Sequence, residues 1–456
     1  MQYSTRKNPV EHGFNDIYPS NQQDLSMNNA HAESNQEPIT SPLDLDLLEQ
    51  IRSQFHHTEH CPYAGKRIYF ESAGGSLTLK SVIERTAELG AVPDNEHRNN
   101  AASKAMSSVV EEGLENLKLL FGAKSGVVFG GETGTECLFR LVRSAVLASP
   151  EGGSILSSSV EHPSTYSATQ IWAENTSREW IEVPFDTRSG VVSAADYASC
   201  VRPDTRVATV IHTNPVTGVV MDIKAIIDAI RAIAPECYVI VDGIQHAPHG
   251  YLDVEAYGAD AYVLSLYKVY SKFNNGYAWL SDRMSVIPHD RLIGKPNNVW
   301  ELGSRDPSAL AAITEVVKYL AWLGKQFTQE AGTRDQLHAA GKVMLQHERA
   351  LISMLLNGNA EHCGLLGMQG VTVVGTTDIN QREGVVSFCV ENMETANLVE
   401  LLGDRGIRIH TRSSDIYSGN ILRPLGIESV ARVSFAHYNT EEEVRTFLEN
   451  LLEILK

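Results

Sequence analysis

Two side chains with distinctive chemistry follow short apolar segments of the sequence. Asp242 comes after the segment 238–241, and Lys268 comes shortly after the segment 261–265. A carboxylate in such a position can keep a cationic ring nitrogen protonated. A lysine that is removed from water has a lowered pKa and readily forms an imine with a carbonyl group. Taken singly, Asp242 is more simply interpreted as a turn or helix-capping residue, and Lys268 as a surface residue. A functional interpretation of either residue therefore depends on the residues around it.

The turn from Gly130 to Glu136, with the sequence GGETGTE, joins an apolar segment to an amphipathic one. Small residues at the start of a helix leave backbone amides exposed, and such amides bind phosphate groups. Gly134 and Thr135 are the best-placed donors, and Ser265 offers a further hydroxyl close to the lysine. The turn does not have the Walker A pattern, and a glycine-rich turn alone is not specific. It predicts a site for the phosphate of a ligand.

Four more polar side chains lie at or near apolar segments. His162 could stack on a flat ring or relay protons, and the amide of Asn214 or Gln245 could bind a phenolic oxygen. Arg432, in a strand-like segment, could bind a carboxylate through two parallel hydrogen bonds. For each of these four residues, a purely structural role is the alternative interpretation. Together with the residues described above, they match the needs of pyridoxal 5′-phosphate (PLP), whose protonated ring acts as an electron sink.

The pattern of the chain indicates which elements position these residues. From 67 to about 323, short apolar segments alternate with amphipathic ones, as in 153–159 followed by 162–174. This alternation predicts strands and helices that form a mostly parallel sheet covered on both faces. Ligand sites in such sheets lie in the loops at the carboxyl ends of the strands. The predicted sheet therefore gathers side chains that are far apart in the sequence.

The sequence predicts four regions. Residues 1–42 are polar and rich in Asn, Gln, Ser and His, which indicates a mobile arm. Residues 43–66 open with helical apolar spacing and are predicted as an N-terminal helix that joins the small domain. Residues 67–330 are predicted to form the large ligand-binding α/β domain. The mixture of strand and helix patterns in residues 331–456 predicts a smaller α+β domain.

The composition argues against several classes of protein. The net charge is -18 and no cluster of lysine and arginine stands out, so a nucleic-acid binder is not expected. The six cysteines are scattered without a CxxC pair, which predicts neither a disulfide framework nor a metal site. No apolar run has the length of a bilayer span, and the N-terminus lacks the order of a signal peptide. We expect a cytoplasmic protein without membrane or nucleic-acid partners.

Nine segments of the chain resemble those of the class V aminotransferase family, which includes cysteine desulfurases and selenocysteine lyases. The segments are YFESAGG, NEHRNN, TGTE, EHPS, HTNPVTG, VDGIQHAPH, SLYK, WELGS and ARVSFAHYNTEEEV. The resemblance runs from about 68 to 455 and is most specific between 241 and 268. It implies an α/β protein of PLP fold type I with a mostly parallel, seven-stranded type of sheet flanked by helices. It also implies a smaller α+β C-terminal domain and a homodimer with shared active sites.

The resemblance implies a role for each matching residue at the cofactor. Lys268 would hold PLP as a Schiff base, Asp242 would pair with the pyridinium nitrogen, and His162 would stack on the ring. Tyr267 stands where the desulfurases usually have a histidine, and a desulfurase-like subgroup is similar in having tyrosine there. The other implied cofactor contacts are Gly134, Thr135 and Ser265 at the phosphate, Asn214 and Gln245 near the phenolic oxygen, and Gly303 and Ser304 at the phosphate in the partner subunit.

Substrate contacts are implied as well. Arg432 would bind the carboxylate of a small amino-acid substrate, and His97 and Arg98 match a motif at the substrate entrance. Desulfurases carry a sulfur-accepting cysteine on a loop that resembles residues 410–419 here, but this segment, HTRSSDIYSG, contains no cysteine. The leading prediction is therefore a desulfurase-like lyase without the persulfide cysteine. It would remove a proton from Cα and then release or exchange a substituent on Cβ.

Other reactions remain open at this point. The segment GGETGTECLFRL resembles a secondary-metabolism branch of the family, some of whose members decarboxylate aspartate-like substrates and form carbon–carbon bonds. A true aminotransferase and an epimerase use the same machinery. A non-catalytic PLP-binding regulator is the alternative from another class. The presence of Lys268, Asp242 and Arg432 together argues against it, because a scaffold needs neither an electron sink nor a carboxylate clamp.

Overall fold

The structure is a computed structural model that describes residues 39–456, which belong to one compact unit. The predicted mobile arm of residues 1–42 lies almost wholly outside the described residues. Within residues 39–456, no helix is both long and apolar enough to cross a membrane.

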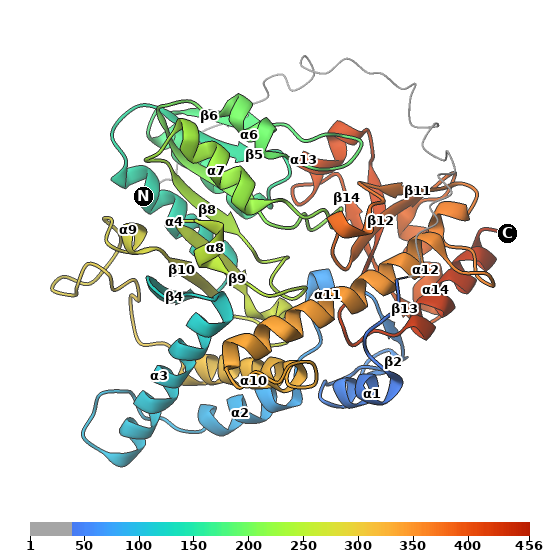
Figure 1. Ribbon diagram of the computed structural model, residues 1–456, viewed down its shortest axis with the longest axis horizontal. Helices are drawn as coiled ribbons and strands as arrows, with labels where there is room; N and C mark the ends of the chain where they lie inside the picture. The colour runs from blue at the N-terminus through green and yellow to red at the C-terminus, as the bar shows by residue number, and fades with distance from the viewer. Residues whose placement is uncertain (1–38) are drawn as a thin grey trace, which may run out of the picture. The chain divides into compact units, whose positions relative to one another are not determined.

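A seven-stranded sheet forms the centre of the first and larger part of the described chain (Figure 1). Its strands β10 and β9 are buried along their whole length, as expected for a sheet covered on both faces. Only β10 runs antiparallel to its neighbours, so the predicted mostly parallel sheet is confirmed. The spatial order is β4 (Val127–Gly131), β10 (Gly276–Leu280), β9 (Ala261–Ser265), β8 (Tyr238–Asp242), β7 (Thr205–Ile211), β5 (Ser154–Ser158) and β6 (Glu179–Val183).

Successive residues of the strands supply two hydrophobic cores, one on each face of this sheet. In β8, Val239 and Val241 belong to the core that contains the buried isoleucines of α7, whereas Ile240 belongs to the core that contains Leu141 of α4. The amphipathic spacing of both helices explains why they cover the sheet. The helices of this part are α2 (Lys80–Gly90), α3 (Ala101–Phe121), α4 (Gly134–Ala148), α5 (Pro163–Asn175), α6 (Ala194–Cys200), α7 (Ile223–Ile233), α8 (Val254–Tyr257), α9 (Asp282–Ser285) and α10 (Pro307–Gly324).

A four-stranded antiparallel sheet with its own hydrophobic core forms the second part. The long helix α11 packs against α10 at one end and α14 at the other, and so links the two parts (Figure 1). The predicted boundary near residue 330 stays a prediction. The order is β11 (Val371–Val374), β12 (Val385–Val390), β15 (Ser429–Ser434) and β14 (His410–Ser413), with helices α11 (Thr333–Asn357), α12 (Thr395–Asp404), α13 (Gly419–Leu422) and α14 (Glu441–Ile454), while β13 (Ile407–Arg408) pairs with β3 (Ile68–Tyr69).

The N-terminal helix is shorter than the sequence pattern predicts. Helix α1 covers Leu45–Ser53 only, and Arg52 near its end donates a hydrogen bond of 2.7 Å to the carbonyl oxygen of Tyr438. The prediction of a helix over 43–66 is therefore wrong beyond Ser53. Pro62 lacks the amide that a helix requires, and Gly65 has a φ of 76°, which favours a turn. The segment instead forms a hairpin of β1 (His60–Cys61) and β2 (Gly65–Lys66).

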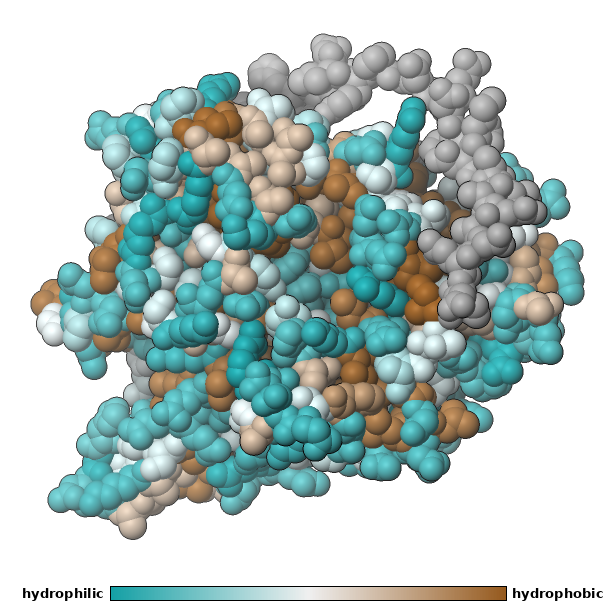
Figure 2. All heavy atoms as spheres, in the orientation of Figure 1, coloured by the Kyte–Doolittle hydropathy of each residue, from teal (hydrophilic) through white to brown (hydrophobic). Residues whose placement is uncertain are grey.

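Polar residues dominate the visible face of the described residues, and apolar ones are interspersed among them (Figure 2). This agrees with a chain whose acidic residues outnumber its basic ones, 56 to 38. Scattered exposed apolar side chains are normal for a folded protein.

Candidate active site

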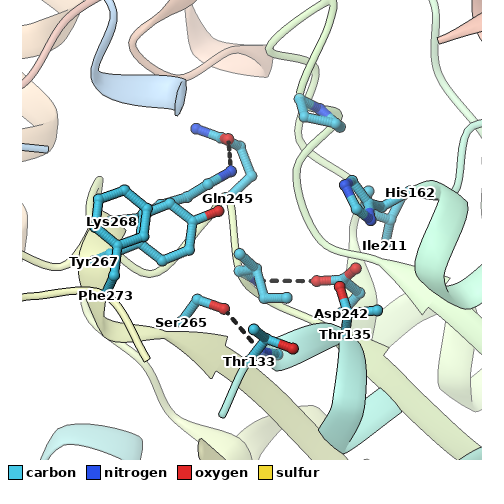
Figure 3. A pocket seen from close by; sticks show the side chains of 13 residues that line it. Thr133, Thr135, His162, Ile211, Asp242, Gln245, Ser265, Tyr267, Lys268 and Phe273 are labelled. Atoms are coloured by element: carbon cyan, nitrogen blue, oxygen red, sulfur yellow. Dashed lines mark hydrogen bonds between the residues drawn. The ribbon is translucent and has the colours of Figure 1, made fainter. Parts of the chain in front are cut away.

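A cavity of about 270 Å³ lies where the carboxyl ends of the parallel strands meet. The strands run in one direction, so the side chains that follow β4, β5, β8 and β9 arrive at one edge of the sheet. Figure 3 shows Lys268 and Tyr267 on one side of the cavity, and His162 with Asp242 on the other. Eight of its thirteen lining residues were predicted from the sequence: Gly134, Thr135, His162, Asp242, Gln245, Ser265, Tyr267 and Lys268.

Lys268 is the buried amine of this cavity. It ends a short 3₁₀ turn that directly follows β9, and only 7% of the residue is exposed. Its Nζ donates a hydrogen bond of 2.8 Å to Oε1 of Gln245 (Figure 3). Burial, followed by the positive charge of Arg432, lowers the pKa of the amine to about 7. The amine is therefore neutral in a large fraction of molecules near neutral pH, as a nucleophile or base requires.

Asp242 is the last residue of β8 and is 2% exposed. Its carboxylate accepts hydrogen bonds from the amide of Ile244 at 3.1 Å and from the hydroxyl of Thr165 at 3.3 Å. Burial raises the pKa of this carboxyl group, while these hydrogen bonds and the charge of Lys268 oppose the rise. Sequence reasoning missed Thr165, although its position one turn after His162 could have suggested it.

His162 lies across the cavity from the lysine (Figure 3), and its neighbour Glu161 is buried next to it in the chain. His162 caps α5 by accepting a hydrogen bond from the amide of Ser164, and burial followed by the charge of Lys268 lowers its pKa to about 3. The ring is thus neutral and flat. Glu161 was not predicted. It is fully buried, and burial followed by the charge of Asp242 raises its pKa to about 8, so it is largely protonated at neutral pH.

The predicted phosphate turn is packed too tightly for a side chain at Gly134. Helix α4 begins at Gly134, whose amide donates a hydrogen bond of 3.2 Å to the hydroxyl of Ser265. A Cβ on Gly134 would lie 2.4 Å from Cδ1 of Ile244 and 2.6 Å from Oγ of Ser265. The first amides of a helix have no partners within the helix and bind anions. The glycine therefore brings the start of α4 against the end of β9, beside the lysine.

A buried hydrogen-bond chain extends from Lys268 into the second part of the molecule. Gln245 accepts from the lysine, and its Nε2 lies 3.2 Å from Nε2 of His249. Nδ1 of His249 lies 2.7 Å from Oε2 of Glu348, on α11, and both side chains are at most 1% exposed. Since the amide nitrogen must donate, Nε2 of His249 accepts and Nδ1 donates to the carboxylate. The pair thus fixes the orientation of the amide that holds the lysine.

Replacement of Glu348 by alanine is expected to lower the free energy of unfolding by about 1–3 kcal/mol, because it leaves the buried Nδ1–H of His249 without an acceptor. The matched control is Asp228→Ala, which breaks the exposed i,i+4 pair with Lys224. That change is expected to cost about 0.3–0.5 kcal/mol. Urea unfolding followed by circular dichroism measures both. Equal small losses would contradict the importance of the buried pair.

Several predicted residues lie outside the cavity wall. Arg432 is buried behind it and donates a hydrogen bond of 2.8 Å to the carbonyl oxygen of Pro215, which lines the cavity. Asn214 is engaged in its own turn, where its Oδ1 accepts from the amides of Val216 and Thr217. The structure therefore does not bring Asn214 into the cavity wall. Both residues lie in the same region of the molecule, and their predicted roles stay predictions.

Four other predicted residues are more distant. Gly303 and Ser304 line a separate polar cavity of about 390 Å³, so they do not meet the residues around Lys268 within one chain. Their predicted partner was the phosphate in a second subunit, and this stays a prediction. His97 and Arg98 are exposed in the loop before α3, and His97 has a φ of 62°. They too are not in the cavity wall.

Phe273 is a lining residue that sequence reasoning missed. Its ring stacks on that of Tyr267, with centroids 4.7 Å apart and planes inclined by 11°. The ring is 67% exposed, which is unusual for a phenylalanine. An aromatic residue five positions after the lysine was the only signal in the sequence, and it does not distinguish a lining residue from a core residue.

Comparisons with known proteins agree with this arrangement. A family model described as aminotransferase class-V matches residues 68–447. Aminotransferase-like protein FGM3 of Gibberella zeae is 28% identical over 90% of this chain and 98% of its own length. Cysteine desulfurase-like protein ustD of Aspergillus flavus is 25% identical over 92% of each chain.

A solved apo structure of cysteine desulfurase from Thermococcus onnurineus NA1 has the same fold, with a TM-score of 0.77 at 19% identity. The superposition covers 91% of this chain and 99% of that one. The fold, the match to the family model over most of the sequence and the full-length relatives agree with one another. The chain therefore belongs to the class V aminotransferase family of PLP-dependent enzymes.

Proposed function

We propose that this chain binds PLP through Lys268 and acts on a small amino acid as a desulfurase-like lyase that needs no persulfide cysteine. One observation carries the proposal: a buried lysine of lowered pKa shares a cavity with a buried carboxylate and the start of helix α4. The reaction would begin with loss of the Cα proton and continue with release or exchange of a Cβ substituent. When bound, PLP supplies a protonated ring that accepts the electrons of a bond broken at Cα.

The residues that the structure places in the cavity fit this cofactor. The volume of about 270 Å³ is close to the ~300 Å³ at which small-molecule sites begin. Gly134 lets the start of α4 lie directly against Ser265, so that the amides of this helix start and the serine hydroxyl can face one phosphate. Asp242 provides a buried carboxylate for a ring nitrogen, and neutral His162 provides a flat surface. Tyr267 and Ser265 complete the proposed cofactor contacts.

The residues of the site divide the work of the proposed reaction, and Lys268 has two tasks, attachment of the cofactor and, once the substrate has freed its amine, proton transfer. The neutral amine of Lys268 accepts the proton from Cα and returns it later, and Gln245 holds that amine in place. Asp242 holds a proton on the ring nitrogen. Arg432 binds the α-carboxylate of the substrate and so sets which bond at Cα is aligned for cleavage. In this scheme the proposed homodimer would bring Gly303 and Ser304 to the phosphate in the active site of the other subunit. The enzyme would act in the cytoplasm.

The state of the cysteines supports a reaction without a persulfide. A thiol must ionise to attack sulfur. Cys389 lies in β12, and burial raises the pKa of its thiol to about 11. Cys363 precedes β11 and pairs with Gly358 through an isolated backbone β-bridge. It does not line the cavity. The loop that follows β14 contains no cysteine.

Spectroscopy and trapping test the proposal. Purified protein is titrated with PLP, the visible absorption band is recorded, and borohydride reduction followed by peptide mapping locates the attached residue. We expect attachment at Lys268. A panel of cysteine, cysteine conjugates and aspartate then shows whether keto acid, thiol or carbon dioxide is released. A protein that remains colourless with PLP would contradict the proposal, and release of carbon dioxide would replace the lyase by a decarboxylase.

The lowered pKa of Lys268 predicts how its reactivity depends on pH. In the PLP-free protein, acetylation by acetic anhydride should increase up to about pH 7 and then level off, because the neutral amine is the nucleophile. A lysine in water titrates near ~10.4 and would continue to gain reactivity beyond pH 9. Mass mapping measures both in one sample, with exposed Lys224 as the internal control. A profile for Lys268 parallel to that of Lys224 would show that burial does not activate the amine.

A further inference from the structure

One side-chain amide links the lysine of the cavity to a buried acid–base pair. Oε1 of Gln245 accepts the hydrogen bond of 2.8 Å from Nζ of Lys268, and its Nε2 lies 3.2 Å from Nε2 of His249. Gln245 lines the cavity (Figure 3), whereas His249 and its partner Glu348 do not. His249 therefore reaches the lysine through the amide.

The two ends of this amide require different protons on its neighbours, because the nitrogen donates and the oxygen accepts. With Oε1 toward Lys268, the amine can be charged or neutral, but Nε2 of His249 must be free of a proton. With Nε2 of Gln245 toward Lys268, the amine must be neutral, and Nε2 of His249 must carry a proton. If both neighbours were protonated, two donors would face each other in either orientation.

Packing leaves no easy escape from such a conflict. His249 is 1% exposed and Gln245 is 3% exposed, so no bulk water separates the groups. A Cβ on Gly384 would lie 2.8 Å from Oε2 of Glu348 and 3.2 Å from Cε1 of His249, which shows how closely the backbone encloses this pair. A buried donor that faces another donor loses the hydrogen bond that would offset its removal from water. The amide thus couples the two protons.

His249 is able to hold the proton. Its Nδ1 lies 2.7 Å from Oε2 of Glu348, whose other carboxylate oxygen is buried without a hydrogen-bond partner. Burial opposes a charge on His249, but Glu348 and then Glu383 outweigh it and raise the pKa of the imidazole. The pKa of Lys268 is lowered to about 7. The amine and the imidazole therefore compete for a proton in the same range of pH.

The other titratable groups near His249 leave this competition in place. Glu383 is paired with His246 at 2.6 Å. Burial lowers the pKa of His437 to about 3 and raises that of the Tyr270 phenol, so both stay neutral. Among the described residues, the groups around His249 are Glu348 on α11, Glu383 before β12, Lys268 and Tyr270 after β9, His437 after β15 and His246 on the same loop.

We infer that His249 is a positioning residue whose proton excludes a proton on Lys268, because the amide of Gln245 can serve only one of the two. A proton on Nε2 of His249 turns Oε1 of Gln245 toward the imidazole and Nε2 of Gln245 toward the lysine, whose amine is then neutral. Its role in the reaction rests on the proposed function, in which the neutral amine of Lys268 accepts the Cα proton.

The PLP-free protein tests this inference through the pH at which acetylation of Lys268 by acetic anhydride is half-maximal. Glu348→Gln keeps an oxygen that accepts from Nδ1 of His249 but removes the charge that holds a second proton on the ring. We expect the midpoint of Lys268 to rise by about 0.5–1 pH unit, which corresponds to one hydrogen bond. A charge effect alone would lower the midpoint, since a carboxylate near an ammonium group is lost.

A second variant gives the same expectation by another route. His249→Gln offers an oxygen to Nε2 of Gln245 and cannot take up the proton, so the midpoint of Lys268 should rise as well. In charge terms the two changes differ, because one removes an anion and the other a cation. Both rises should disappear in a Gln245→Met background, in which no amide connects the two sites.

Controls show whether each variant is folded and whether the effect is local. Thermal unfolding and circular dichroism establish the native fold of each variant. Asp290→Asn removes an exposed carboxylate that pairs with Arg143, and it should leave the midpoint of Lys268 unchanged. Exposed Lys224 again serves as the internal control. If Glu348→Gln does not fold, His249→Gln with and without Gln245→Met carries the test.

The outcomes separate this inference from the proposed function. If the wild-type protein does not take up PLP at Lys268, the proposed function fails, and the acetylation midpoints alone decide whether the two protons are coupled. If PLP is taken up but the midpoint falls or stays the same in the folded variants, only the role of His249 is overturned. A rise that persists in the Gln245→Met background would also overturn it, because the effect would then bypass the amide.

Discussion

Lys268→Ala is expected to abolish covalent attachment of PLP and to lower turnover by at least about 10³-fold. Acid–base catalysis by one positioned side chain contributes roughly 10²–10⁴-fold, and this lysine is also the proposed point of attachment. The amine is buried, held by Gln245, and has its pKa lowered to about 7. No other described lysine lines the cavity and could replace it. Single-turnover assays and the visible spectrum measure the two losses.

A lysine outside the cavity provides the matched control for this experiment. Lys318→Ala removes an amine from the exposed side of α10, where it pairs with Glu315. Attachment and turnover should then remain within about twofold of the wild type, since surface pairs contribute only about 0–1 kcal/mol. If Lys268→Ala kept the absorption band that borohydride reduction removes, another residue would be the point of attachment, and the assignment of the site would have to be abandoned.

Asp242→Asn is expected to leave PLP attached to Lys268 and to lower turnover by roughly 10²–10⁴-fold. The buried carboxylate is the proposed partner of the ring nitrogen, and an amide cannot hold a proton there. Removing one partner of a buried charged pair costs about 3–5 kcal/mol, and each ~1.4 kcal/mol is a tenfold change in rate. Borohydride trapping measures attachment and steady-state assays measure turnover, so binding and chemistry are separated.

A graded variant tests whether the carboxylate acts as proposed. Thr165→Val removes the hydrogen bond of 3.3 Å to Asp242 while keeping the shape of the side chain. The loss of one hydrogen bond corresponds to about 0.5–1.5 kcal/mol, or roughly three- to tenfold in turnover. Wild-type turnover in Asp242→Asn would show that the carboxylate is structural. An effect of Thr165→Val as large as that of Asp242→Asn would point to collapse of the site instead.

The fold and the centre of the site could be predicted because both depend on local pattern. Alternating apolar and amphipathic segments require a covered parallel sheet, and a parallel sheet places the residues after its strands at one edge. For this reason Asp242, Lys268 and the turn at Gly134 could be grouped from the sequence, although more than a hundred residues separate the first and last of them. The helix predicted over 43–66 was too long, because a pattern in its first turns says little about where a helix ends.

Contacts between distant segments could not be predicted in the same way. Glu348 lies on α11 and reaches His249 only after the two parts of the molecule have packed together. Arg432 reaches the carbonyl oxygen of Pro215 because of the register between β14 and β15, and a shift of one residue would turn it to the opposite face. Nothing in the local sequence of either residue specifies these partners.

By itself, the sequence determined the class of fold, the family and the residues that follow the strands, because these depend on periodicity and on short motifs. Only the tertiary structure decided which of these side chains share a cavity and which lie outside it, as Asn214 and His97 do. It also decided their protonation. The lowered pKa of Lys268 and the raised pKa of Glu161 come mainly from removal of water by packing, and packing is a property of the whole folded chain.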